Sequence, residues 1–99
     1  FKVAIDSSNA IGEGANALDA AVSIYPNPMS ESATLSFENP ERIKHQVVLY
    51  DAVGREVRRI SNVVSGQVNI EKSELTNGIF FVQLWRNGQN IATRKLVID

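Results

Sequence analysis

The 99-residue chain contains no cysteine, which removes a disulfide framework, a thiolate metal site and a cysteine nucleophile from consideration. It also carries little net charge, because ten Lys and Arg face eleven Asp and Glu and leave a formal charge of -1. A chain with this balance has no overall attraction for nucleic acid or anionic lipid. We therefore expect no nucleic-acid partner, and we expect stability to come from packing alone.

Long apolar runs are also missing, and none reaches the ~20 residues that a membrane-spanning helix needs. Apolar residues nowhere keep the i, i+3, i+4, i+7 spacing of an amphipathic helix over several turns, which argues against an α-rich fold. The chain starts at Phe1 with no Met and no signal segment, so we expect a fragment of a longer precursor with a passenger domain before it.

The first 21 residues differ in composition from the rest. Ser7 to Asp19 is rich in Ser, Asn, Gly and Ala, and it has too little apolar area to offset the entropy of ordering, so it is predicted to be a linker. Phe1 to Ile5 alternates apolar and polar residues, which fits either the last strand of a preceding domain or a boundary segment. We therefore divide the chain into a linker or passenger tail at residues 1–21 and a folded domain at residues 22–99.

From Ala21 onward, short β-rich runs recur at intervals of roughly ten residues, which is typical of a sandwich or barrel. Ala33, Leu35 and Phe37 share one face of such a run and are expected to be buried. The predicted fold class is all-β, with seven strands at residues 22–25, 33–37, 46–50, 55–60, 67–70, 79–85 and 91–98.

Glycines mark the predicted turns. Gly54 is expected to supply a positive φ in the hairpin after the third run, and Asn87-Gly88 predicts a type I′ turn between the last two runs. Lys72 to Gly78 is too short for a stable helix and is predicted to form a helical turn closed by its glycine. Within it, Leu75 is expected to plug one end of the core.

Chemistry-bearing residues are few. His45 is the only histidine, and we interpret it as a solvated strand residue in preference to a member of a Ser-His-Asp site. One histidine without cysteine does not make a zinc site. Two carboxylate pairs, Glu38 with Glu41 and Glu71 with Glu74, are expected to face water and not a substrate. We predict no catalytic, cofactor-binding or metal-ligating residue and no enzyme activity.

A binding module is the main alternative from a different class. Arg55, Arg58 and Arg59, joined by Arg42 and Lys44, form a basic cluster in the sequence that would suit a phosphate or glycan. Trp85 or Tyr50 would offer a stacking face to a sugar. We favour the interpretation that these basic residues form a charged outer face and that the aromatic residues lie in the core. A carbohydrate- or protein-binding adhesion module therefore remains the second hypothesis.

Four blocks of sequence carry a resemblance to a known family. They are Ile24 to Pro28, Val48 to Val57, Leu75 to Val82 and Lys95 to Ile98, in that order. Together they resemble the type A C-terminal sorting domains of the type IX (Por) secretion system. The residues that match the family's structural motifs are Tyr25, Pro26, Asn27, Pro28, Asp51, Gly54, Leu75, Gly78 and Phe80. Phe80 stands where many relatives have tyrosine, so a hydroxyl bond at this corner is not expected.

The resemblance implies an immunoglobulin-like, seven-stranded antiparallel β-sandwich that follows an N-terminal passenger domain. It also implies export across the outer membrane of Bacteroidota: the domain is recognised in the periplasm by machinery that includes an outer-membrane shuttle. A sortase-like peptidase then cuts within the linker, between about Ser7 and Ala21, where small residues suit a protease cleft. The passenger is released or attached to glycolipid at the cell surface, and no cofactor is involved.

The resemblance and the strand pattern together point to the end of the chain as the recognised part. No residue follows Lys95, Leu96, Val97, Ile98 and Asp99, so this segment is free to engage a partner. If it forms an edge strand, addition to a partner's sheet is a plausible mode, while the apolar residues complete the core. An exposed edge would also allow self-association.

Overall fold

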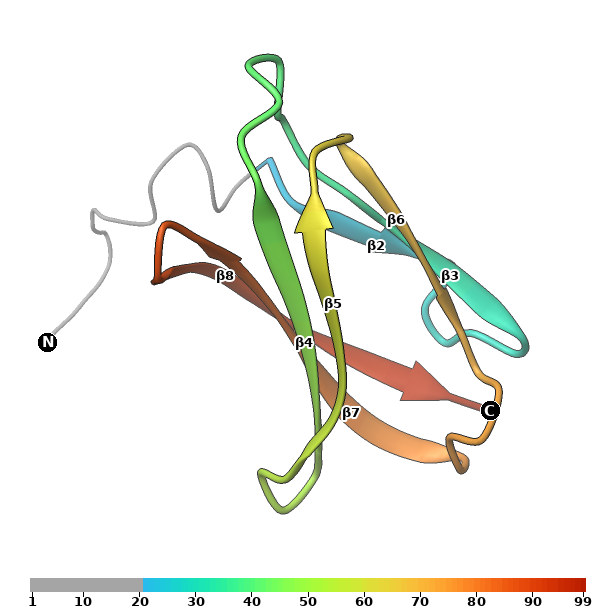
Figure 1. The fold of residues 1–99 in the computed structure, drawn as a ribbon. Helices are drawn as coiled ribbons and strands as arrows, with labels where there is room; N and C mark the ends of the chain where they lie inside the picture. The colour runs from blue at the N-terminus through green and yellow to red at the C-terminus, as the bar shows by residue number, and fades with distance from the viewer. Residues whose placement is uncertain (1–20) are drawn as a thin grey trace, which may run out of the picture.

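The computed structural model describes residues 21–99, and these residues form seven β-strands (Figure 1). The strands are β2 (Ser23–Tyr25), β3 (Ser32–Ser36), β4 (His45–Asp51), β5 (Glu56–Val63), β6 (Gln67–Glu71), β7 (Gly78–Arg86) and β8 (Gln89–Ile98). Each lies where the alternation of apolar and polar residues predicts it, with bounds shifted by at most a few residues.

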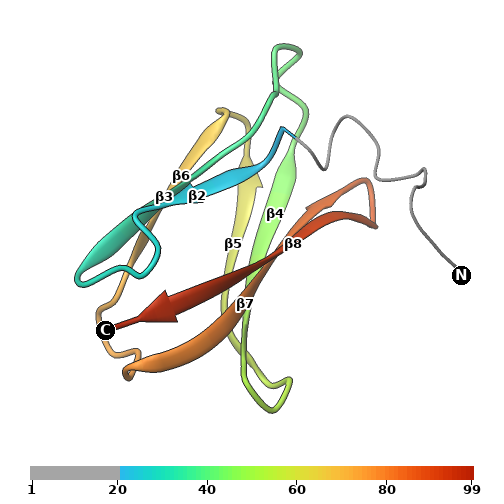
Figure 2. The ribbon, with the colours of Figure 1, turned by 180° about the vertical axis from the view of Figure 1, so that it is seen from behind.

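The strands make two antiparallel sheets, and Figures 1 and 2 show these sheets as two facing layers. One sheet has the order β2-β3-β6, and the other has the order β5-β4-β7-β8. In the second sheet β4 and β7 are central, which explains why the sequence of β4 is apolar on both faces. The predicted seven-stranded β-sandwich is thus confirmed.

The core lies between the two layers and is built from alternate residues of both sheets. Ala33, Leu35 and Phe37 are buried, as the period of two predicts. Apolar side chains that are almost fully enclosed include Met29, Leu35, Leu49, Ile70, Leu84, Leu96 and Ile98. The burial of this apolar area is the main favourable term available to a domain without disulfides.

The turns largely follow the prediction. Gly54 has a φ of 91°, and the β7–β8 turn has φ values of 53° at Asn87 and 73° at Gly88. Lys72 to Gly78 is different, because it forms one hydrogen-bonded turn, from the Leu75 amide to the Lys72 carbonyl at 2.7 Å, and no helix. The segment crosses from β6 in one sheet to β7 in the other. Leu75 is buried, so it does plug the end of the core.

Several expectations lie outside the described residues. These are the strand at Phe1 to Ile5, the linker at Ser7 to Asp19 and most of the expected cleavage region. Within residues 21–99 there is no helix long and apolar enough to cross a membrane.

Candidate functional site

His45 is buried, so the expectation of a solvated histidine is wrong. The strand β4 starts at His45, one residue earlier than predicted, and the alternation places its side chain on the same inner face as Val47 and Leu49. The ring is 2% exposed, and its centroid lies 4.8 Å from that of Phe37. Its Nδ1 is 2.7 Å from the Ile43 carbonyl oxygen, which makes Nδ1 the protonated nitrogen. His45 is therefore a core residue.

The described residues do not assemble a metal site. No group of three or more His, Asp or Glu in residues 21–99 is arranged to hold a metal ion. The carboxylate pairs Glu38 with Glu41 and Glu71 with Glu74 are exposed, as expected. Asn69 donates from Nδ2 to Glu71 Oε2 at 3.1 Å, which gives that carboxylate a structural partner.

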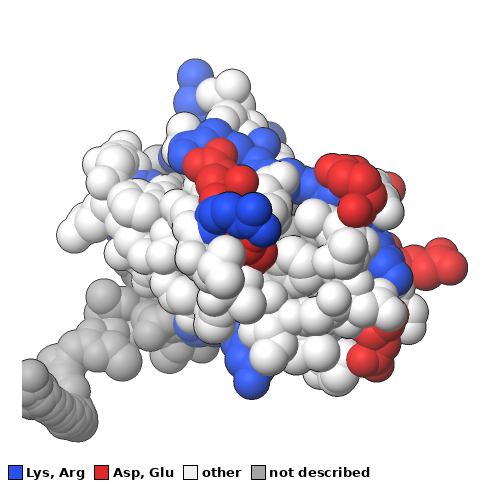
Figure 3. Space-filling view, turned by 90° about the horizontal axis from the view of Figure 1, so that it is seen from below, with Lys and Arg blue, Asp and Glu red and all other residues white. Residues whose placement is uncertain are grey.

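The arginines that cluster in the sequence are separated and paired in the structure. Arg55 Nε lies 2.8 Å from Asp51 Oδ2, and Arg58 reaches Glu74 at 3.5 Å and the Glu71 carbonyl. Figure 3 accordingly shows basic and acidic side chains next to one another, with broad uncharged areas between them. Within residues 21–99, Arg55, Arg58 and Arg59 are thus each paired with a different carboxylate and do not form one shared basic site.

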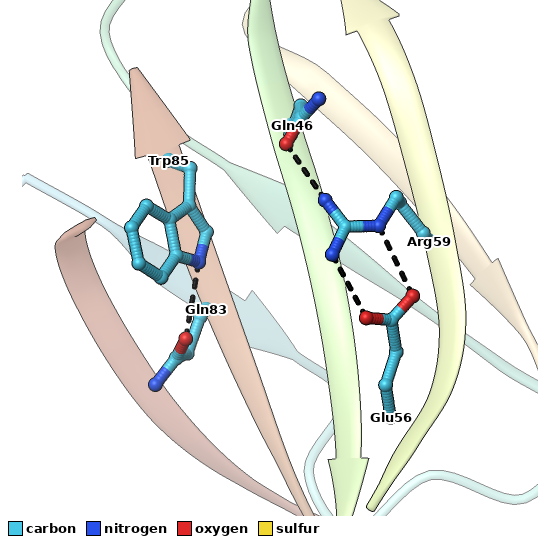
Figure 4. Close-up of polar contacts among 5 residues, drawn as sticks. All are labelled: Gln46, Glu56, Arg59, Gln83 and Trp85. Carbon is cyan, nitrogen blue, oxygen red and sulfur yellow. Dashed lines mark hydrogen bonds and ion pairs between the residues drawn. The ribbon is translucent and has the colours of Figure 1, made fainter. Parts of the chain in front are cut away.

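Arg59 makes the most extensive of these networks (Figure 4). Its guanidinium donates to both Glu56 carboxylate oxygens, at 2.8 and 3.0 Å, and to Gln46 Oε1 at 2.9 Å. The bond from Arg59 lowers the pKa of Glu56, and the carboxylate in turn raises the pKa of Arg59. The network covers the outer face of β4 and β5.

The aromatic residues Tyr50 and Trp85 lie on the outer face of the four-stranded sheet and not in the core, which corrects the expectation. Gln46 pairs with Trp85 across the strands, and Tyr50 pairs with Phe81. Trp85 donates from Nε1 to Gln83 Oε1 at 3.0 Å (Figure 4). Because this bond uses the Gln83 oxygen, the Trp85 ring and its neighbouring amide are fixed to each other.

Of the residues expected to be recognised, Lys95 to Ile98 form the end of β8, an edge strand of the four-stranded sheet, and Asp99 follows it. Leu96 and Ile98 are 0% and 2% exposed and pack in the core. Lys95 and Val97 alternate with them and lie on the outer face, opposite Phe81 and Ile79 of β7. Only part of this segment is therefore presented to a partner.

The edge of β8 is already bonded at this point by the segment that follows β2. Asn27 donates from Nδ2 to the Lys95 carbonyl at 2.7 Å, and its Oδ1 accepts from the Val97 amide at 3.0 Å. Met29 continues the pairing: its amide donates to the Val97 carbonyl at 2.8 Å, and its carbonyl accepts from the Asp99 amide at 2.9 Å.

This contact gives the Tyr25-Pro26-Asn27-Pro28 motif a physical role. The prolines have no amide hydrogen, so this stretch cannot pair as a strand, and the Asn27 side chain supplies one donor and one acceptor in place of backbone. Met29 is 0% exposed, and sequence reasoning did not single it out. The sequence feature that could have indicated the burial of Met29 is an apolar residue directly after a proline-bounded turn.

The remaining motif residues shape the β4–β5 turn and the start of β7. Asp51 Oδ1 accepts hydrogen bonds from the amides of Val53 at 3.1 Å and Arg55 at 2.9 Å. The Arg55 amide bond, helped by the Arg55 side chain, holds the pKa of Asp51 below its ordinary value of 3.8. Gly78 has a φ of 144°, and Phe80 is buried opposite Leu96.

Two structural residues were not anticipated. The Asn39 side chain donates to the carbonyls of Ile43 and Val64 at 2.9 and 3.0 Å, and it accepts from the Ile43 amide at 3.0 Å. At Gly66, a Cβ atom would lie 2.6 Å from the Phe37 carbonyl oxygen, so only glycine fits. Both contacts join segments that are far apart in the sequence, and no local pattern reveals them.

Comparison with known proteins identifies the family. No curated protein matches the chain. A family model described as secretion system C-terminal sorting domain matches residues 23–99, from the first residue of β2 to the end of β8 and beyond. That range includes the whole sandwich and all four sequence blocks. The chain therefore belongs to the C-terminal sorting domains of type IX secretion, the signals that direct proteins to the cell surface or out of the cell.

Proposed function

We propose that the type IX machinery recognises residues 22–99 as a folded domain and reads the end of β8 from its outer face. The observation that carries this proposal is the family match over residues 23–99, which coincides with the sandwich. Leu96 and Ile98 are enclosed in the core, so they are not available to a partner unless the domain unfolds. Lys95, Val97 and Asp99 are the residues of this segment that remain for recognition.

The finer steps of export form part of the proposal. The domain follows a passenger, is met in the periplasm by the outer-membrane shuttle, and is itself not an enzyme. A sortase-like peptidase then cuts between about Ser7 and Ala21, where the residues are small and fit a protease cleft. The passenger is released or joined to glycolipid at the surface. The cleavage position is supported only by the composition of this segment and by the family resemblance.

An export assay tests the proposal. A fluorescent protein is fused to residues 1–99 and expressed in a bacterium with the type IX machinery and in the same strain with that machinery deleted. We expect the fluorescent passenger at the surface or in the medium only in the first strain, without the mass of residues 22–99. Periplasmic retention in both strains, with the domain folded, would contradict a sorting role and leave a binding module as the better account.

A further inference from the structure

Exposed apolar side chains gather at one end of the four-stranded sheet. Among residues 21–99 the large hydrophobic residues that are exposed are Tyr25, Val53, Ile79 and Phe81. Ile79 and Phe81 lie on the outer face of β7, and Ile79 pairs with Val97 of β8. Val53 is 77% exposed in the turn between β4 and β5. We call Val53, Ile79, Phe81 and Val97 the turn-side patch.

The surface around this patch is hollowed on both sides of the β4–β5 turn. A depression of about 570 Å³ lies between this turn and the start of β7, and Val53, Leu75 and Ile79 are among the residues that line it. A second depression, of about 530 Å³, lies toward β8, and its lining includes Val53, Phe81 and Thr93. Val53 thus separates two hollows, and each can accept an apolar side chain.

Two cations beside the patch have N–H groups left for a partner, whereas Glu74, a carboxylate that lines the first depression, is paired with Arg58 at 3.5 Å. Lys95 pairs with Phe81 across the strands, and its side-chain ammonium has no hydrogen bond or ion pair among the described residues. The Arg55 side chain is 80% exposed and uses only its Nε in the ion pair. Both Asp51 oxygens, in contrast, already accept hydrogen bonds. A complementary partner therefore supplies apolar side chains flanked by carboxylates.

The polar groups near the patch favour a protein over a glycan. Sugar sites pair an aromatic face with side chains that have free donors and acceptors. Here the four patch side chains carry no donor or acceptor, and the oxygens of the neighbouring Gln83 and Thr93 already accept from Trp85 and Asn90. A second copy of the domain would bring its own Lys95 and Arg55 toward these cations, and like charges repel. An apolar protein segment flanked by carboxylates needs no donor or acceptor from the patch, and its charge is opposite to that of Lys95 and Arg55.

We propose that the turn-side patch, with Lys95 and Arg55 at its margin, is the docking surface for an acidic-flanked apolar segment of a type IX machinery protein. The inference rests on the proposed function and names the surface that is read. In this arrangement Val53 and Ile79 insert into the partner, and the cations meet its carboxylates. The edge of β8 is not used at residues 95–99, because Asn27 and Met29 occupy it.

Two variants of the residue 1–99 fusion test the docking surface. They are Lys95→Glu and the double variant Val53→Ser with Ile79→Ser, and all three side chains are exposed, so the fold is retained. Lys44→Glu, an exposed charge reversal at the opposite end of β4, is the matched control. We expect export to fall at least about tenfold in both patch variants, the effect of losing one interface hot spot, and to be unchanged in the control.

A photo-reactive phenylalanine at position 53, compared with one at position 44, identifies what the patch touches in living cells. An adduct between position 53 and a protein of the secretion machinery is the expected result. Adducts only with a second copy, with lipid or with glycan overturn the inference, and so does unchanged export of patch variants whose thermal unfolding is normal. If the unaltered fusion is not exported at all, the proposed function itself fails, so the two failures are distinguishable.

Discussion

The Asn27 side chain takes the place of a neighbouring strand's backbone in pairing with the edge of β8. Its amide group donates to Lys95 and accepts from Val97, so it satisfies two backbone groups on the edge of β8. A carboxylate at this position keeps the acceptor but loses the donor, and it places a negative charge against the Lys95 carbonyl. The two bonds therefore require an amide side chain, which explains why the motif has asparagine at this position.

We expect Asn27→Asp to destabilise the domain by about 0.5–1.5 kcal/mol, the net value of an exposed hydrogen bond. Urea unfolding measures the loss, and hydrogen exchange locates it. The Lys95 to Asp99 amides are expected to exchange faster, while those of β4 keep their protection. Uniform acceleration across both strands would show that the effect is global and that Asn27 does not act locally on β8.

Asp51 gives the domain a defined response to acid. Its pKa is lowered in the folded state by the bond from the Arg55 amide and by the Arg55 side chain. A carboxyl with a lowered folded pKa contributes stability above its ordinary value of 3.8, and this contribution disappears as the pH falls through the lower folded value. Glu56 acts in the same sense through Arg59.

We therefore expect Asp51→Asn to weaken the dependence of stability on pH. An asparagine oxygen can still accept from the Val53 and Arg55 amides, so the turn is kept. Thermal unfolding at about pH 6 and about pH 2 is the measurement, and the difference between the two midpoints is expected to be smaller in the variant than in the unaltered domain. An equal difference in both proteins would mean that Asp51 is not part of the acid response.

At the scale of elements, the two edges of the four-stranded sheet are protected in different ways. The β5 edge carries Glu56, Arg58 and Arg59, and charged side chains on an edge strand discourage pairing with another chain. The end of β8 is covered by Asn27 and Met29. The sequence suggested self-association through an exposed terminal strand, but the backbone groups at the end of β8 are already hydrogen-bonded to Asn27 and Met29.

The isolated domain is thus expected to be monomeric, and Asn27→Asp is expected to increase its tendency to associate. Light scattering over a range of concentrations tests both expectations. A concentration-dependent dimer of the unaltered domain would show that another edge or face is used, and the N-terminal half of β8 would be the first region to probe. A double variant of Asn27→Asp with Val97→Pro, which blocks pairing at β8, is the control.

The strands and most turns could be predicted because they depend on local patterns. Alternation located β3 and its buried face, and Asn87-Gly88 defined the β7–β8 turn with its two positive φ values. His45 shares the inner face of Val47 and Leu49, but β4 is apolar on both faces, so its sequence pattern does not show which face is the inner one. The bonds from Asn27 to β8 and the close approach at Gly66 join distant segments, so no short window contains them.

At the scale of the whole molecule, the domain boundary predicts where the chain can be shortened. The core is formed by residues from Val22 to Ile98, all within the predicted domain at 22–99. We expect a chain that starts at Ala21 to unfold at a temperature within a few degrees of the 99-residue chain, since it keeps every core residue found among residues 21–99. Calorimetry is the measurement, and a much lower unfolding temperature would move the boundary toward Phe1.

Shortening from the other end has the opposite outcome. A chain that stops at Arg94 loses Leu96 and Ile98, and deletion of a buried aliphatic side chain costs about 2–5 kcal/mol. Two such losses approach the whole stability of a typical domain, about 5–15 kcal/mol. Circular dichroism is expected to show an unfolded chain, and a folded one would contradict this assignment. A chain that lacks only Asp99, by contrast, should fold.

The bond between Asn27 and Val97 spans 70 residues of sequence, so it forms only when the segment after β2 and the end of β8 have come together. A chain that ends before Lys95 lacks the backbone groups that Asn27 bonds and leaves Met29 without its partners at the end of β8. The same bonds that cover the edge of β8 thus couple the presentation of residues 95–99 to closure of the sandwich. A machinery that reads this surface would accept folded domains and reject unfolded ones.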